Sequence, residues 1–143
     1  MGFDLNKCYS HPGKLLKVHL ENVASLSKRF TSSHAAELVS LFHDIGKVNP
    51  NFQQKLNGLC PKGYDHHAYL SAYVFFIFLI KNPSILHKFV SHGFNSNNFL
   101  ISLITIVAKH HGDLPDLMPD NGNSILSDNE VVNLYAFLDN ISI

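Results

Sequence analysis

The chain has 143 residues, 45% of them hydrophobic, and no net charge when its histidines are neutral. This length fits one compact domain that can bury a core of its own, and the composition is that of a globular protein rather than a disordered chain. The absence of a basic excess argues against strong binding of nucleic acid by bulk electrostatics. A nucleic-acid substrate would therefore have to be delivered by another component.

The cysteines argue against a zinc–thiolate protein, and the apolar segments argue against a membrane protein. Cys8 and Cys60 form no CxxC motif, so a thiolate zinc site is not indicated, and two unpatterned cysteines fit a reducing cytoplasm. The N-terminal residues lack the layout of a signal peptide. The most apolar run, residues 68–80, is too short to span a bilayer comfortably and favours a buried core helix. We therefore expect a cytoplasmic protein without membrane contact.

Helical periodicity dominates the sequence. Apolar residues recur every three or four positions, and proline, glycine or capping residues mark the ends of the periodic segments. Helices are predicted over residues 14–30, 33–46, 50–58, 66–81, 84–91, 97–111 and 128–140. No convincing alternation typical of a β-strand is present. The sequence therefore predicts an all-α fold, a bundle of five to seven helices.

Local signals set the boundaries of the later helices. Asp65 is a candidate N-cap for the helix that follows it, and Pro83 breaks that helix at its other end. Gly112 is expected to end the helix that carries the paired histidines. Ser127 and Glu130 form a candidate capping box for the last helix.

Five of the ten histidines fall on predicted core-facing sides of four different helices. His19, for example, continues a stripe that contains Leu15, Val23, Leu26 and Phe30. The five are His19, His43, His67, His110 and His111.

A single histidine on an apolar face is usually a core residue with one hydrogen bond. Five histidines beside Asp44 are harder to satisfy, because each neutral imidazole offers one donor and one acceptor. A divalent metal ion resolves this conflict, since it accepts imidazole nitrogen and carboxylate oxygen together. Structural histidines remain the alternative interpretation. Imidazole and carboxylate without thiolate suit manganese, iron, cobalt or nickel and tolerate zinc, whereas magnesium prefers oxygen ligands and remains a weaker possibility.

A short motif narrows the interpretation. His43-Asp44 followed by Gly46-Lys47 resembles the signature of the HD superfamily of metal-dependent phosphohydrolases. Four segments resemble, in the same order, the HD nuclease domain of type I CRISPR interference, which is the nuclease half of the CRISPR-associated helicase–nuclease. These segments are SHPGKLLKVHLENVASL, HDIGKVNPNFQQKL, HHAYLSA and AKHHG. The resemblance covers about residues 9–114, and FQQKL and HHG are its most specific parts.

The resemblance implies a role for each matching residue. The metal ligands would be His19, His43, Asp44, His67, His110 and His111, around two ions that Asp44 bridges. Lys47 would sit beside the scissile phosphate as a positive charge or proton donor; without the family it would be a lysine that meets a helix dipole. Ser71 would support His67, and His11 is a candidate for the outer shell. His66 is not expected to bind.

One feature departs from the family. A further aspartate on a later helix closes the site in the family, and only 28 positions separate His111 from Asp139, the best candidate by context. Asp128 and the absence of any such residue are the alternatives. We expect a single HD nuclease domain over residues 1–143, and its short C-terminal part is interpreted either as a truncation or as a naturally short version.

The resemblance implies a metal-dependent endonuclease or exonuclease that cleaves single-stranded DNA in type I CRISPR interference, an antiviral defence. Its partners would be a CRISPR helicase and a guide-RNA surveillance complex. Two alternatives remain at this stage: a nucleotide phosphohydrolase of the HD superfamily, and a catalytically inactive metal-binding or docking module.

Overall fold

The computed structural model describes residues 4–90 and 96–112. The described chain starts with an antiparallel hairpin, β1 (Tyr9–His11) and β2 (Lys14–Leu15), and is otherwise helical. The helices are α1 (Leu16–Phe30), α2 (His34–Phe42), the 3-10 helix η1 (Ile45–Val48), α3 (Pro50–Leu56), α4 (Ala68–Lys81), α5 (Pro83–Val90) and α6 (Ser96–Ala108). The predicted all-α bundle is confirmed.

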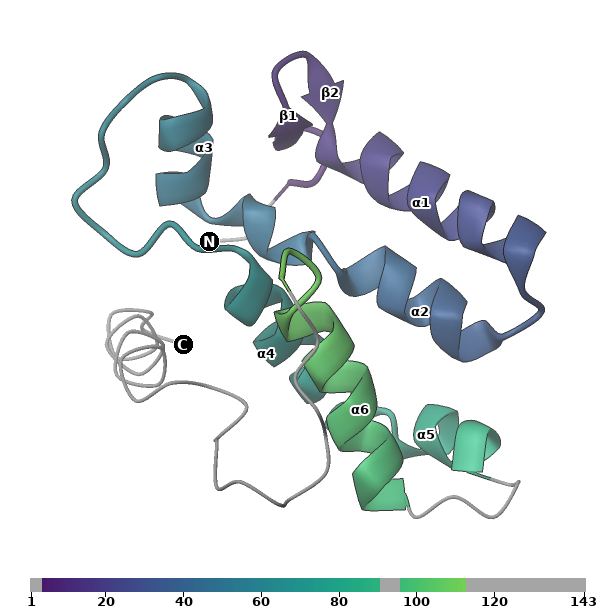
Figure 1. Ribbon diagram of the computed structural model, residues 1–143. Coiled ribbons are helices and arrows are strands. Elements are labelled where there is room, and N and C mark those ends of the chain that lie inside the picture. The colour runs from purple at the N-terminus through teal and green to yellow at the C-terminus, as the bar shows by residue number, and fades with distance from the viewer. Residues whose placement is uncertain (1–3, 91–95, 113–143) are drawn as a thin grey trace.

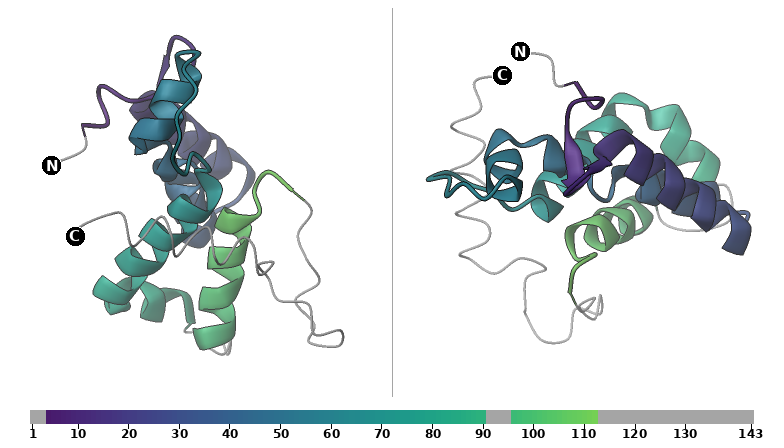
Figure 2. Two further views of the ribbon diagram at one scale, coloured as in Figure 1. Left: turned by 90° about the vertical axis from the view of Figure 1, so that its left-hand side faces the viewer. Right: turned by 90° about the horizontal axis from the view of Figure 1, so that it is seen from above.

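The helices form two packed pairs. α1 lies along α2, and α4 lies along α6, while α2 contacts both members of the second pair (Figure 1). α3 and the hairpin lie beside η1 at one end of the molecule, as the two further views also show (Figure 2). Consequently η1, the start of α4 and the end of α6 come together in space.

The apolar core lies between α4 and α6. Its centre is formed by Phe75, Leu79, Leu103 and Val107, which are at most 4% exposed. Phe42, the last residue of α2, stacks on Phe75 with ring centroids 4.9 Å apart. The core therefore fixes the point at which α2 ends.

Two helices end earlier than the sequence predicts, and a hairpin is present that was not predicted. The helix predicted over 33–46 ends at Phe42, and a separate 3-10 turn follows it. The helix predicted over 97–111 ends at Ala108, four residues before Gly112, so both histidines of the HHG segment follow the helix. The hairpin was not expected, because five residues in two strands contain too little alternation to detect.

Two side-chain predictions are also wrong. The buried face of α1 is formed by Leu16, Leu20 and Ala24, whereas Leu26 and Phe30 of the expected stripe are exposed. Asp65 does not cap α4: the helix has no side-chain cap, and the Asp65 carboxylate instead pairs with Lys55 at 2.6 Å.

Some predictions fall on parts of the chain outside the described residues. These are the helix over 128–140, its capping box, and the candidate ligands Asp128 and Asp139. Among the described helices, none is long and apolar enough to cross a membrane.

Candidate metal centre

Asp44 lies in the connection between α2 and η1 and is only 3% exposed. Close packing of the next turn on the start of α4 holds this connection. The backbone N–H of Gly46 donates to Oγ of Ser71 at 2.9 Å, and the same hydroxyl donates to the carbonyl of His67 at 2.8 Å. A Cβ at position 46 would collide with that carbonyl, so the glycine permits the approach of Asp44 to His67.

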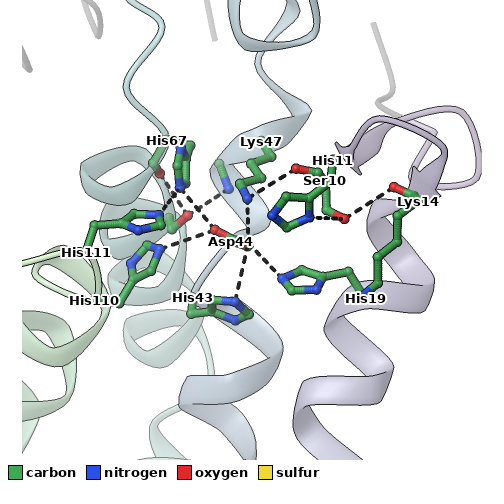
Figure 3. A network of polar contacts seen from close by, with 12 residues as sticks. Ser10, His11, Lys14, His19, His43, Asp44, Lys47, His67, His110 and His111 are labelled. Carbon is green, nitrogen blue, oxygen red and sulfur yellow. Dashed lines mark hydrogen bonds and ion pairs between the residues drawn. The ribbon is translucent and has the colours of Figure 1, made fainter. Parts of the chain in front are cut away.

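Five nitrogens from separate parts of the chain surround the Asp44 carboxylate (Figure 3). On Oδ2 the nearest atoms are Nε2 of His19 at 2.9 Å, Nε2 of His43 at 3.3 Å and Nζ of Lys47 at 2.8 Å. On Oδ1 they are Nε2 of His67 at 3.1 Å and Nε2 of His110 at 3.2 Å. Nε2 of His111 lies 2.8 Å from Nε2 of His67. The structure thus brings together all six described residues that were predicted as ligands.

Two of these rings have a fixed orientation. Nδ1 of His43 lies 2.7 Å from the carbonyl of Ser40, and Nδ1 of His110 lies 2.7 Å from the carbonyl of Val107. A carbonyl only accepts, so in both rings Nδ1 carries the proton and donates it. In the neutral ring, Nε2 is then a bare lone pair that faces a carboxylate oxygen.

This arrangement provides a test of whether a metal ion fits. Two acceptors that face each other at 3.2–3.3 Å repel, unless both rings are charged or a cation lies between them. Charging them would place further imidazolium rings beside the buried ammonium of Lys47. A divalent cation removes the conflict, and an Nδ1–H that donates to a backbone carbonyl is the usual support of a metal-binding histidine. The residues therefore fit a metal ion.

The electrostatics of the cluster favour the protonation states that a metal ion needs. Burial lowers the pKa of His19, His67 and His111, although the negative charge of Asp44 acts in the opposite direction. Burial also acts to raise the pKa of Asp44, but the side chains around its carboxylate, with hydrogen bonds from His67 and Lys47 among them, hold this pKa far below its usual range. These three rings are thus kept neutral beside an ionised carboxylate.

The described ligand atoms form two groups that meet at Asp44. One contains Asp44, His67, His110 and His111, and the other contains Asp44, His19 and His43. Each group offers its atoms within 4.8 Å of one another, and each combines imidazole with carboxylate. The cluster could therefore hold divalent metal of a type that accepts nitrogen.

Lys47 turns into this cluster rather than toward a helix dipole. Its side chain is 5% exposed, and besides Asp44 its ammonium donates to the carbonyl of Ser10 in β1 at 3.3 Å. Gln53 of α3 supports β1, since its side-chain amide both accepts from the N–H of Tyr9 at 3.0 Å and donates to the carbonyl of Tyr9 at 2.8 Å. Sequence reasoning did not identify Ser10 or Gln53 individually, although Gln53 lies within the FQQKL segment.

The remaining candidates lie at the edge of the cluster or away from it. The His11 ring stands against the His19 ring with centroids 5.4 Å apart, and its Nδ1 lies 3.2 Å from Oγ of Ser10 (Figure 3). Ser71 does support His67, but through the backbone carbonyl rather than the ring. His66 is exposed and lies outside both ligand groups.

A helical bundle with histidines gathered around a buried His-Asp pair defines an HD-type domain, a class that binds divalent metals. The sequence matches the family described as "Cas3, HD domain" over residues 10–131, which is most of the chain. The chain therefore belongs to this family of CRISPR-associated HD nucleases. No curated protein and no solved structure shows significant similarity to it.

Proposed function

We propose that the protein is a metal-dependent nuclease that hydrolyses phosphodiester bonds of single-stranded DNA during type I CRISPR interference. The observation that carries this proposal is the convergence of His19, His43, His67 and His110 on the single carboxylate of Asp44. Membership of the Cas3 HD family supplies the biological setting.

Each residue of the cluster has a proposed task. The histidines of both groups would bind metal together with the carboxylate of Asp44, which belongs to each group. Bound divalent ions would supply an activated water and stabilise negative charge on the phosphate. The carbonyls of Ser40 and Val107 hold two of the rings in the tautomer that presents a lone pair. Lys47 adds a buried positive charge at the same place, and its direct contact with the scissile phosphate stays a prediction.

The charge of the whole chain bears on how the substrate arrives. With no net charge, the chain has little bulk attraction for a polyanion. We therefore propose that a CRISPR helicase and a guide-RNA surveillance complex deliver the single strand to the site. A substrate supplied in this way needs only local contacts with the metal centre.

The direct test is cleavage of a labelled single-stranded DNA oligonucleotide with manganese, nickel, cobalt, iron or magnesium added to the EDTA-treated protein. We expect cleavage with one or more of the metals that accept nitrogen, and none in EDTA. Asp44→Ala should reduce the rate at least about a thousandfold, because the carboxylate common to both ligand groups is lost. His66→Ala is the matched control, since it removes an exposed histidine outside both groups.

Three outcomes would redirect the assignment. Equal cleavage by the wild type and by Asp44→Ala would contradict the metal role of Asp44. Hydrolysis of nucleoside phosphates or cyclic dinucleotides without cleavage of DNA would favour a phosphohydrolase. Bound metal detected by elemental analysis without any turnover would favour an inactive module.

A further inference from the structure

Lys47 reaches into the metal centre from η1 and takes a hydrogen-bond acceptor from a distant strand. Its ammonium lies 2.8 Å from Oδ2 of Asp44 and donates to the carbonyl of Ser10 in β1 at 3.3 Å (Figure 3). Because the side chain is only 5% exposed, water cannot readily replace a lost acceptor. The position of this positive charge therefore depends on where β1 lies.

The strand β1 has little support from its own sheet. It has three residues and pairs only with the two residues of β2 in the described chain, and a two-stranded hairpin is marginally stable at best. Gln53 of α3 supplies a further support. Its side-chain amide accepts from the N–H of Tyr9 at 3.0 Å and donates to the carbonyl of Tyr9 at 2.8 Å. The amide thus pairs with both backbone groups of one residue, as a neighbouring strand would.

The same amide also bonds the backbone of Lys47. Nε2 of Gln53 donates its second hydrogen to the carbonyl of Lys47 at 2.7 Å. Both hydrogens of this nitrogen are then used, and Oε1 accepts as well. The contacts form a closed ring, which runs from the Lys47 backbone through Gln53 and β1 to the Ser10 carbonyl and back along the Lys47 side chain. Gln53 therefore sets how far the acceptor on β1 lies from the backbone of η1.

The start of α3 anchors the helix that carries Gln53. Asn49, which caps this helix, is 2% exposed and donates from Nδ2 to the carbonyl of Tyr64 at 2.7 Å. The N–H of Gln53 donates in turn to the carbonyl of Asn49 at 3.0 Å. The neighbouring Phe52 has its ring centroid 5.5 Å from Nζ of Lys47. The helix α3 thus presents an aromatic ring and an amide to the same lysine.

We propose that Gln53 is a positioning residue for the metal centre: its amide holds β1 against η1 and thereby keeps the Lys47 ammonium on the carboxylate of Asp44. Gln53 needs no contact with metal or DNA for this task. The use of the Lys47 charge in DNA cleavage rests on the proposed function, whereas the position of the ammonium does not.

The test is a proton–nitrogen NMR spectrum of the lysine ammonium groups, recorded on isotope-labelled, EDTA-treated protein. A buried, hydrogen-bonded ammonium exchanges its protons slowly with water and gives a signal, whereas an exposed one does not. The wild type should show a signal that Lys47→Met lacks, which assigns it. Gln53→Ala should lose this signal, because the ammonium loses the carbonyl on β1 and reaches water. Gln54→Ala is the matched control, since it truncates the neighbouring, exposed glutamine and should keep the signal.

Phe75→Ala separates displacement of Lys47 from a general loss of stability. It removes a fully buried side chain from the apolar core between α4 and α6, so it should lower the stability and still keep the signal. If Gln53→Ala does not fold, as judged by circular dichroism, Gln53→Met takes its place. That variant keeps most of the side-chain volume, removes all three side-chain hydrogen bonds and should lose the signal too.

Three results would overturn the positioning role of Gln53. They are a wild type without a Lys47 signal, a signal that persists in Gln53→Ala or Gln53→Met, and a signal that is lost equally in Phe75→Ala. Because the spectra are recorded without metal or DNA, a protein that gives the expected spectra but cleaves no DNA would overturn the proposed function alone.

Discussion

The two buried regions that share α4 are held together by different forces. Beyond its first turn, α4 contributes Phe75 and Leu79 to an apolar core against α6. At its start, His67 and Ser71 belong to a polar cluster in which one carboxylate faces five nitrogens. Dispersion and burial stabilise the first region without any ion, whereas the second is balanced only when its charges and lone pairs are satisfied. Mutations within this single helix should therefore change the stability of the fold and the binding of metal separately.

Phe75→Ala should have the largest effect on stability. The side chain is fully buried and stacks on Phe42, so its removal should lower the free energy of unfolding by about 3–5 kcal/mol. Urea unfolding in EDTA measures this loss. The folded fraction should still bind Mn²⁺ with nearly wild-type affinity, and a loss of affinity as large as that of Asp44→Ala would show that the two regions are not separable.

The sequence could predict which residues meet at the polar cluster, but not how they are held. His19 lies in the cluster although Leu26 and Phe30 of its predicted stripe are exposed. His110 and His111 also lie there although they follow the helix, and the bond from the Lys109 N–H to the Thr105 carbonyl carries the helical hydrogen-bond pattern one residue past Ala108. The inward turn of Lys47 could not be predicted, since its partner Ser10 is 37 positions away and acts through a backbone carbonyl. Long-range contacts of this kind leave no periodic signal.

Adding metal should stabilise the polar cluster and not the apolar core. Mn²⁺ at about a hundred times its dissociation constant should raise the free energy of unfolding of the wild type by about 2.7 kcal/mol, because it binds the native state. Phe75→Ala should gain the same increment, and Asp44→Ala should gain none. Thermal unfolding with and without Mn²⁺ provides the measurement. An equal gain in Asp44→Ala would place the bound ion elsewhere.

Gly46→Ala should affect both the stability of the fold and metal binding, because Gly46 lies at the contact between η1 and α4. The added methyl would collide with the carbonyl of His67 and approach the backbone nitrogen of Ser71 to 2.8 Å. We expect a loss of about 1–3 kcal/mol in stability together with weaker metal binding, since Asp44 and His67 are forced apart.

Gly58→Ala is the comparison for this variant. Its backbone φ of 77° disfavours alanine, but no atom lies within 4 Å of the new methyl. It should therefore lose about 1 kcal/mol of stability without any change in the affinity for Mn²⁺. Equal metal affinities in the two variants would show that the packing of Gly46 does not set the geometry of the centre.

Acid should weaken the metal-free polar cluster while the apolar core is unaffected. His67 and His19 are largely buried, and burial holds their pKa below the usual value of histidine. Below about pH 6.5 the unfolded chain therefore binds more protons than the native state. Stability should therefore fall as the pH is lowered from 7.5 to 5.5, by at most about 1.4 kcal/mol per pH unit for each of the two rings. His111 contributes less because water screens it, and Asp44 stays ionised throughout this window.

Urea unfolding at three pH values in EDTA should give the same slope of stability against pH for the wild type and for Phe75→Ala, and a shallower slope for His67→Gln. A wild-type stability that is constant over this range would mean that these rings are charged in the native state, and the argument that they present lone pairs to a metal ion would fail.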